Sequence, residues 1–228
     1  MKAVLLAGGL GTRLREETEY RPKPMVPVGG KPIIWHIMKN YAHYGVDDFV
    51  VCLGYQGDVI RDYFLNYEAR MNDFTVHLGS KHSVEYHDAH DESDWTVTLA
   101  ETGAETMTGG RLFRVRKHGK TATVTTVRPV SRFGVMDIAE DGSVRQFREK
   151  PQADGYVNAG FFVFEPRIFD YLDAECILEQ EPLARLAADG ELMSYRHEGW
   201  WQPMDTYREY VMLNELWDAG SPPWRLWS

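Results

Sequence analysis

The first half of the chain alternates short apolar runs with amphipathic segments. Ala3–Leu6 is an apolar run that ends in glycines, which is typical of a buried strand that stops at a turn. Apolar residues then recur at helical spacing across Ile33–Tyr44, a second apolar run follows at Asp48–Leu53, and a further helix is predicted over Asp58–Tyr67. This order of strand, helix, strand and helix predicts a parallel sheet with helices on both faces.

Beyond residue 73 the pattern shifts toward strands. The polar stretch His82–Asp94 holds His82, His87 and His90 among acidic residues, and we interpret it as a solvated loop, with a metal site as the alternative. Apolar runs predict strands at Thr75–Leu78, Trp95–Leu99, Thr121–Val127, Gly134–Ile138, Val144–Phe147 and Gly160–Phe164. Helical spacing predicts helices at Arg167–Leu172, Glu181–Asp189 and Thr206–Ala219.

Composition narrows the class of protein. The 228 residues carry a net charge of −9, which argues against a general nucleic-acid binder because phosphate backbones require a positive face. No apolar run approaches the roughly 20 residues that a membrane span needs. The two cysteines, Cys52 and Cys176, lie far apart without metal-site spacing, which fits a reducing compartment. We therefore expect a cytoplasmic, globular protein that binds neither nucleic acid nor membrane.

A glycine-rich loop follows the first predicted strand. In Leu6-Ala7-Gly8-Gly9-Leu10-Gly11-Thr12-Arg13 the glycines allow backbone N–H groups to approach phosphate oxygens without an intervening Cβ. The carboxyl end of a parallel strand is also where open α/β sheets bind ligands. The spacing matches neither the Gly-Lys-Ser/Thr phosphate loop nor the dinucleotide fingerprint, and the glycines alone would fit a plain turn.

A second motif places a lysine between two prolines. In Arg21-Pro22-Lys23-Pro24-Met25 the prolines restrict the backbone, so Lys23 is either solvated at a surface turn or held rigidly over a phosphate. Together with Gly29-Gly30-Lys31-Pro32, the two motifs resemble the sugar-1-phosphate nucleotidyltransferases. The resemblance is greatest to members that use CTP and glucose 1-phosphate, and it extends to Met107–Arg111, Phe147–Pro151, Asn158–Phe162 and Trp201–Thr206.

This resemblance implies an α/β, Rossmann-like, three-layer α/β/α nucleotidyltransferase fold with a mixed, mainly parallel sheet and a small C-terminal extension. We expect one domain over residues 1–228, with a nucleotide-binding half at 1–115, a sugar-phosphate half at 116–199 and a Trp-rich extension at 200–228. The implied reaction transfers a cytidylyl group from CTP to α-D-glucose 1-phosphate and gives CDP-glucose and pyrophosphate. Because two anions must meet, charge neutralisation and alignment are the main catalytic tasks.

The resemblance also implies roles for individual residues. Arg13 and Lys23 are the implied catalytic residues: Arg13 would hold the leaving pyrophosphate and Lys23 the α-phosphate. Lys150 would bind the phosphate of the sugar phosphate, although a Glu-Lys pair after a strand is in general a surface ion pair. Asn158 and Gly160 would face the sugar hydroxyls. The implied nucleotide-binding residues are Leu6, Ala7, Gly8, Gly9, Leu10, Gly11, Thr12, Arg13, Lys23, Thr106 and Arg111.

Mg²⁺ is the cofactor that the resemblance implies, and Asp205 resembles one of its two carboxylate ligands. The alternative role for Asp205 is to cap the helix predicted next to it. In the family the other carboxylate belongs to a Tyr-Gly-Asp-Gly-type strand end that follows the Gly-Gly-Arg helix. No Gly-Asp-Gly occurs in this chain.

The chain departs from the family pattern after this helix. Arg111–Val115 passes almost directly into Arg116–Thr121, which leaves no room for the roughly 30 residues of a strand–helix–strand unit. We therefore expect a missing segment near residues 115–116. It was omitted from the sequence, removed by an engineered deletion, or lost in a natural homologue. We favour omission, because loss of a central strand together with a metal ligand would impair both fold and catalysis.

Five of the seven tryptophans follow residue 199, namely Trp200, Trp201, Trp217, Trp224 and Trp227. Such a cluster forms core or packs against a partner subunit, and we expect a homo-oligomer.

Two rival functions remain beside the CTP-dependent one. The first is a nucleotidyltransferase that uses UTP or dTTP, because base choice depends on details of the loops. The second is a catalytically inactive homologue that binds a nucleotide sugar, because the chain lacks one metal carboxylate.

Overall fold

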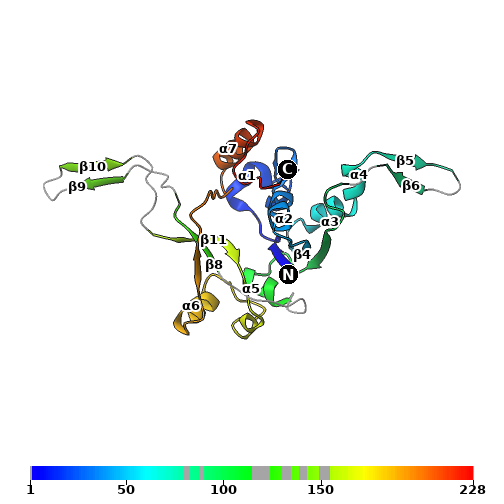
Figure 1. Cartoon of the computed structure of the whole chain (residues 1–228). Helices are drawn as coiled ribbons and strands as arrows, with labels where there is room; N and C mark the ends of the chain where they lie inside the picture. The colour runs from blue at the N-terminus through cyan, green and yellow to red at the C-terminus, as the bar shows by residue number, and fades with distance from the viewer. Residues whose placement is uncertain are drawn as a thin grey trace.

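The computed structural model describes residues 2–79, 83–87, 90–114, 124–129, 135–138, 143–148 and 155–227. Figure 1 shows a central group of strands and helices from which two hairpins project at opposite ends. None of the helices in these ranges is long and apolar enough to cross a membrane.

The central sheet contains three parallel strands, in the order β1 (Lys2–Leu6), β4 (Asp48–Leu53) and β7 (Thr96–Glu101). The uninterrupted apolar run of β4 is buried from Phe49 to Leu53, as a strand covered on both faces requires. The helices that connect and follow these strands are α2 (Ile33–His43), α3 (Gly57–Leu65) and α4 (Tyr67–Met71). The predicted α/β fold with parallel strands is confirmed, and β4 has the predicted bounds.

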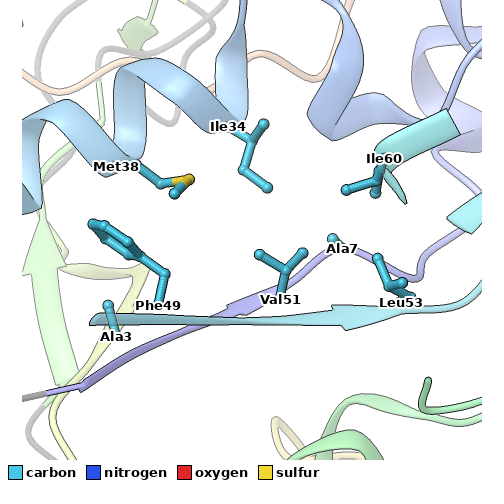
Figure 2. Packing of buried hydrophobic residues seen from close by; sticks show 8 residues of the cluster. All are labelled: Ala3, Ala7, Ile34, Met38, Phe49, Val51, Leu53 and Ile60. Atoms are coloured by element: carbon cyan, nitrogen blue, oxygen red, sulfur yellow. The ribbon is translucent and has the colours of Figure 1, made fainter. Parts of the chain in front are cut away.

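Figure 2 shows the main core, which lies between α2, α3 and one face of the sheet. Ile34 and Met38, four residues apart on α2, point toward Phe49 and Val51 of β4, and all four are fully buried. Helical spacing in one element and alternation in the other therefore build the same interface. Cys52 points to the opposite face, where burial raises the pKa of its thiol to about 12 and leaves it protonated at neutral pH.

β1 lies at an edge of the central sheet. Among the described residues it pairs with β4 alone, and Val4 and Leu6 remain 37% and 38% exposed. Parallel sheets are normally covered on both faces, so the exposure of Val4 and Leu6 shows that β1 is incompletely covered. The free backbone edge of β1 can therefore accept another strand.

A second sheet has the order β11 (Val157–Phe162), β8 (Val124–Val127) and β12 (Ser194–Arg196), with β8 antiparallel to β11 and parallel to β12. Its neighbourhood contains α5 (Thr108–Arg114), a 3₁₀ turn (Pro166–Asp170) and α6 (Glu181–Ala188). These elements share a separate core of buried aliphatic side chains, formed by Leu112, Ile168, Leu172, Leu178 and Leu186. The helix predicted at Arg167–Leu172 is thus a single 3₁₀ turn, because the Asp173 carboxylate accepts the N–H groups of Glu175 and Cys176 and turns the chain.

Three hairpins complete the strands of the described residues: β2 (Pro27–Val28) with β3 (Lys31–Pro32), β5 (Phe74–His77) with β6 (Ser83–Tyr86), and β9 (Val135–Ile138) with β10 (Val144–Arg148). The solvated loop expected over His82–Asp94 is partly wrong, because residues 83–86 pair with β5. No group of metal-binding side chains occurs in the part of the chain that the structure describes. His87 instead contacts the Thr75 hydroxyl and His90 the Glu68 carboxylate, while His82 lies outside the described residues.

The Trp-rich extension packs against its own chain. Trp217, which lies on α7 (Tyr207–Asp218), surrounds His36 of α2 together with Trp224 and Trp227, and their ring centroids lie 4.9–6.2 Å from the imidazole. These three tryptophans are partly buried and extend the core around His36, whereas Trp200 of the same cluster is 41% exposed.

The contacts of His36 require a neutral imidazole. Its Nε2 lies 2.8 Å from the Val28 carbonyl oxygen and must donate, so Nδ1 accepts the Trp224 indole N–H at 3.4 Å. Burial, the largest cause, lowers the pKa of His36 below its usual value of 6.5. Below pH 6.5 His36 is therefore protonated in the unfolded chain while it stays neutral in the folded chain. The free energy of unfolding then decreases as the pH falls below 6.5.

We predict that the wild-type protein loses free energy of unfolding between pH 7.5 and pH 5.5 faster than His36→Gln does. The difference should reach up to about 1.4 kcal/mol per pH unit below pH 6.5. Urea unfolding at both pH values measures it, with His43→Gln at the exposed end of the same helix as the control. Equal pH slopes for wild type and His36→Gln would contradict the neutral, buried imidazole.

Candidate active site

The glycine loop lies where β1 ends. The Ala7 N–H donates to the Cys52 carbonyl (3.0 Å) and the Tyr55 N–H to the Gly8 carbonyl (3.2 Å), so the loop is fastened to the end of β4. Gly11 has a φ of 64°, a conformation that favours glycine, and leads into the 3₁₀ turn Thr12–Leu14. The loop therefore occupies the carboxyl edge of the parallel sheet.

Lys23 opens another 3₁₀ turn, Lys23–Met25, directly after Pro22. The Met25 N–H donates to the Pro22 carbonyl (2.8 Å), and the Val26 N–H donates to the Lys23 carbonyl (3.1 Å). Pro22 and Val26 are both buried. The backbone of Lys23 is thus anchored on both sides, while its ammonium group extends to the surface.

Asp205 precedes α7 but does not cap it. The cap is Thr206, whose hydroxyl accepts the Glu209 N–H, while the Glu209 carboxylate accepts the N–H groups of Thr206 and Asp205. The predicted alternative, capping by Asp205, is therefore wrong. Because Thr206 supplies the cap, the Asp205 carboxylate is directed to other partners.

Those partners are the two cations from the opposite end of the chain. Lys23 Nζ lies 2.6 Å from Asp205 Oδ1, and Arg13 NH1 lies 2.6 Å from Asp205 Oδ2. A surface cavity of about 240 Å³ surrounds them, lined by Gly11, Thr12, Arg13, Leu14, Lys23 and Asp205. The structure thus brings together three of the predicted site residues. Asp205 lies 182 positions from Lys23 and 192 positions from Arg13 in the sequence.

The charges of this cavity suit an anionic ligand. Two cations and one carboxylate give it a positive balance, and the Arg13 side chain is 79% exposed. Exposed ion pairs contribute little to stability, so the cations can exchange Asp205 for another oxygen anion at little cost. An entering phosphate would compete with Asp205 for both of them.

Arg111 lies beneath the glycine loop and is almost completely buried. Its guanidinium donates to the Gly8 carbonyl (2.9 Å), the Leu53 carbonyl (3.0 Å), the Thr102 hydroxyl (2.8 Å) and the Ala104 carbonyl (3.2 Å). It therefore links the ends of all three parallel strands. Burial is the main cause that lowers the pKa of Arg111 from its usual value.

Gly8 and Gly54 leave space for this guanidinium. A Cβ built on either glycine would overlap Arg111, whereas one built on Gly9 meets no atom within 4 Å. The function of Gly8 in the described structure is thus to admit an arginine. Sequence reasoning treated this glycine as a phosphate-binding position and missed the buried role of Arg111 and of Thr102, although the pairing of a glycine strand end with a Gly-Gly-Arg helix is a usable signal.

The remaining predicted site residues lie elsewhere. Thr106 lies in the turn between β7 and α5, where its N–H donates to the Gly103 carbonyl (3.4 Å). Asn158 and Gly160 lie on β11, with the Gly160 N–H donating to Asn158 Oδ1 (2.8 Å), and neither lines the Lys23 cavity. Lys150 lies outside the described residues.

A comparison with protein families identifies this arrangement. The family model described as Nucleotidyl transferase matches residues 2–91 and 111–206, which include the glycine loop, Lys23, Arg111 and Asp205. The chain belongs to the nucleotidyl transferase family. The predicted resemblance is therefore confirmed at the level of the family.

The sequence of this nucleotidyl transferase aligns over its whole length with those of several relatives. A glucose-1-phosphate cytidylyltransferase of Salmonella typhi is 48% identical, and a probable glucose-1-phosphate cytidylyltransferase of Bacillus subtilis is 40% identical; each comparison covers 100% of both chains. The Salmonella typhi alignment extends over 259 positions, and because this chain has 228 residues, 31 of those positions hold no residue here.

Solved structures share the fold. HddC from Yersinia pseudotuberculosis superimposes with a TM-score of 0.67 at 21% identity, covering 95% of this chain and 99% of that one. A CTP:phosphocholine cytidylyltransferase from Streptococcus pneumoniae gives a TM-score of 0.63 at 17% identity, covering 95% and 98%. The predicted nucleotidyltransferase fold class is thereby confirmed.

We predict that Gly8→Ala and Arg111→Met act on the same contact. Arg111→Met leaves buried carbonyls without donors and should lower the free energy of unfolding by about 3 kcal/mol. Gly8→Ala should cost on the order of 2 kcal/mol through overlap with the guanidinium. The double variant should lose clearly less than the sum, because the added methyl group then has space.

Urea unfolding of the wild type, both single variants and the double variant measures this coupling. Gly9→Ala, one residue further along the same loop, should change stability little, since its new Cβ meets no neighbour. Additive losses in the double variant would contradict the proposed packing of Arg111 against Gly8.

Proposed function

We propose that this chain transfers a cytidylyl group from CTP to α-D-glucose 1-phosphate and releases CDP-glucose and pyrophosphate. The observation that carries the proposal is the pair of cations, Lys23 and Arg13, held at the glycine loop of a chain that is 48% identical over its whole length to a glucose-1-phosphate cytidylyltransferase. A phosphate oxygen of the sugar phosphate attacks the α-phosphorus of CTP, and the bond from that phosphorus to the pyrophosphate oxygen breaks.

The two cations would divide the charge of this reaction between them. Lys23, with an anchored backbone, would hold the α-phosphate and stabilise the charge that develops on it in the transition state. Arg13, which is more exposed, would bind the leaving pyrophosphate through its planar guanidinium. Residues 6–12 would direct backbone N–H groups to the nucleotide.

The other predicted residues would complete the two substrate sites. Arg111 would act on the nucleotide by holding the Gly8 carbonyl and the ends of β4 and β7 in place, and Thr106 would contact the nucleotide from the turn before α5. Lys150 would bind the phosphate of the sugar, and Asn158 and Gly160 its hydroxyl groups. Residues 1–115 would thus form the nucleotide half and 116–199 the sugar-phosphate half, with 200–228 as the extension.

Magnesium fits this cavity as a site with one protein carboxylate. Among the described residues, Asp205 is the only acid that lines the cavity, and Mg²⁺ is commonly held by one or two carboxylates together with substrate phosphates. Asp205 would therefore hold the ion once phosphates have replaced it as the partner of Lys23 and Arg13. The ion would supply charge neutralisation on the phosphates.

We further propose that a strand–helix unit is missing between α5 and β8. The 31 alignment positions without a residue in this chain match the length of one such unit, and the free edge of β1 could pair with its strand. The mass of the protein from its natural source tests this. A mass near 26.2 kDa would refute the idea that the segment was merely omitted from the sequence.

Two alternatives follow from particular observations. The presence of one carboxylate among the described residues of the cavity favours a catalytically inactive homologue that still binds nucleotide sugars. Use of UTP or dTTP in place of CTP is the other alternative, since the described contacts concern phosphate rather than base.

A homo-oligomer is also part of the proposal, and the cytoplasmic location stays a prediction that the unpaired Cys52 and Cys176 support.

We predict pyrophosphate release with glucose 1-phosphate that is fastest with CTP. Faster turnover with UTP or dTTP would show that CTP is not the preferred nucleotide. Nucleotide binding without any turnover would favour the inactive homologue. The measurement is kcat/KM for each of the three nucleotides in the presence of Mg²⁺.

The Lys23→Ala variant should lower kcat on the order of a hundredfold or more, because it removes charge stabilisation from the transition state. Arg15→Ala, an exposed arginine two residues after Arg13, is the matched control and should retain the wild-type rate. An unchanged kcat in Lys23→Ala would remove Lys23 from the catalytic role.

A further inference from the structure

Two arginines lie against one tyrosine at an end of the second sheet. The guanidinium carbon of Arg128 is 4.7 Å from the centre of the Tyr156 ring, and that of Arg196 is 5.2 Å from it. Arg128 directly follows β8, Tyr156 directly precedes β11, and Arg196 is the last residue of β12. Each of the three strands thus contributes one side chain to this group, which we call the arginine subsite.

The strand register places these side chains on one face of the sheet. Thr126 of β8 pairs with Asn158 of β11 and with Arg196 of β12, so these three residues form one row across the strands. Arg128 lies two positions after Thr126, and Tyr156 lies two positions before Asn158, so both share the face of that row. The arginine subsite therefore lies on the same face as Asn158, the proposed contact of the sugar hydroxyl groups.

The Tyr156 ring holds the two guanidinium groups at the surface. Its hydroxyl donates to the Glu198 carboxylate at 3.2 Å, which fixes the position of the ring. Arg128 and Arg196 are both exposed. A guanidinium that lies over an aromatic ring keeps its N–H groups at its own rim, which is the geometry in which arginine binds phosphate and carboxylate.

The charge of the subsite favours an anion. Two guanidinium groups and the Glu198 carboxylate give it a positive balance, whereas the whole chain has a net charge of −9. An acidic protein repels an anionic substrate unless its binding site carries a local positive field. The arginine subsite supplies such a field on the face that carries Asn158.

Its position indicates which anion it binds. The phosphates of CTP are assigned above to Lys23 and Arg13 at the glycine loop, which belongs to the other sheet. Tyr156 lies two positions from Asn158, about 7 Å along the strand, so one small ligand can contact both Asn158 and the subsite. Glucose 1-phosphate carries the two kinds of group required, namely hydroxyl groups and a phosphate.

We infer that Arg128 and Arg196 bind the phosphate of the incoming sugar 1-phosphate and hold the sugar beside Asn158. They act on binding of the second substrate, before any bond forms or breaks. The inference rests on the proposed function, because that function makes a sugar 1-phosphate the second substrate. It adds two binding residues that lie outside all the motifs described above.

Calorimetry with the full chain tests the subsite directly. Glucose 1-phosphate is titrated in the presence of saturating CTP and a chelator that removes Mg²⁺. Arg128→Gln and Arg196→Gln should each raise the Kd of glucose 1-phosphate about tenfold, because each variant loses a charge-assisted hydrogen bond. The Kd of CTP should stay unchanged. Equal Kd values for glucose 1-phosphate in wild type and both variants, or no binding to the wild type, would overturn the inference.

Arg185→Gln is the matched control. Arg185 lies 5.0 Å from the centre of the Tyr171 ring and is also exposed, but it belongs to α6. This variant should bind glucose 1-phosphate as the wild type does, and an equal rise in Kd would overturn the assignment. Arg196→Lys retains the charge and should recover most of the affinity. A Kd as high as that of Arg196→Gln would contradict binding through charge. Circular dichroism checks that each variant is folded.

Pyrophosphate release by the wild type separates this inference from the proposed function. Turnover together with binding that does not depend on the two arginines would overturn the subsite and leave the function in place. Binding that depends on the arginines without any turnover would support the subsite and overturn the function.

Discussion

The carboxylate of Asp205 lies between Lys23 and Arg13, and the site depends on this contact. It joins the start of α7 to the glycine loop and to the Pro-Lys-Pro segment, so residues from both ends of the chain line one cavity. Its energy as an exposed ion pair is small. Its importance is that one carboxylate holds two cations together, and that both cations can exchange this carboxylate for a phosphate.

The position of the two cations depends in turn on how the glycine loop is supported. Arg111 reaches under the loop from α5 and donates to carbonyl groups at the ends of β1 and β4 and to the hydroxyl of Thr102, just after β7. Such a buried guanidinium fixes the loop rigidly, because removing it leaves several carbonyl groups without donors. Within the described residues the same sheet has an open edge at β1, so the described contacts support the loop on the β4 side.

Patterns within short stretches of the sequence predicted individual strands and helices of this structure. The bounds of β4 follow from an unbroken apolar run, and helical spacing over Thr206–Ala219 predicted α7 to within one residue at each end, although its cap is Thr206 and not Asp205. Three features depend on distant contacts and could not be found in this way: the burial of Arg111, the packing of the tryptophans on His36, and the pairing of β6 within a stretch rich in histidine and acids. That Lys23 and Asp205 belong to one site was expected only through resemblance to a family, and their direct contact was not expected, because no local pattern connects residues 182 positions apart.

The central claim is that Asp205 and phosphate compete for the same two cations. Titration calorimetry of CTP binding in metal-free buffer, with wild type and with Asp205→Asn, tests it most directly. The account predicts tighter CTP binding by Asp205→Asn, because Lys23 and Arg13 are then released from the carboxylate. Weaker or unchanged binding by Asp205→Asn would contradict it.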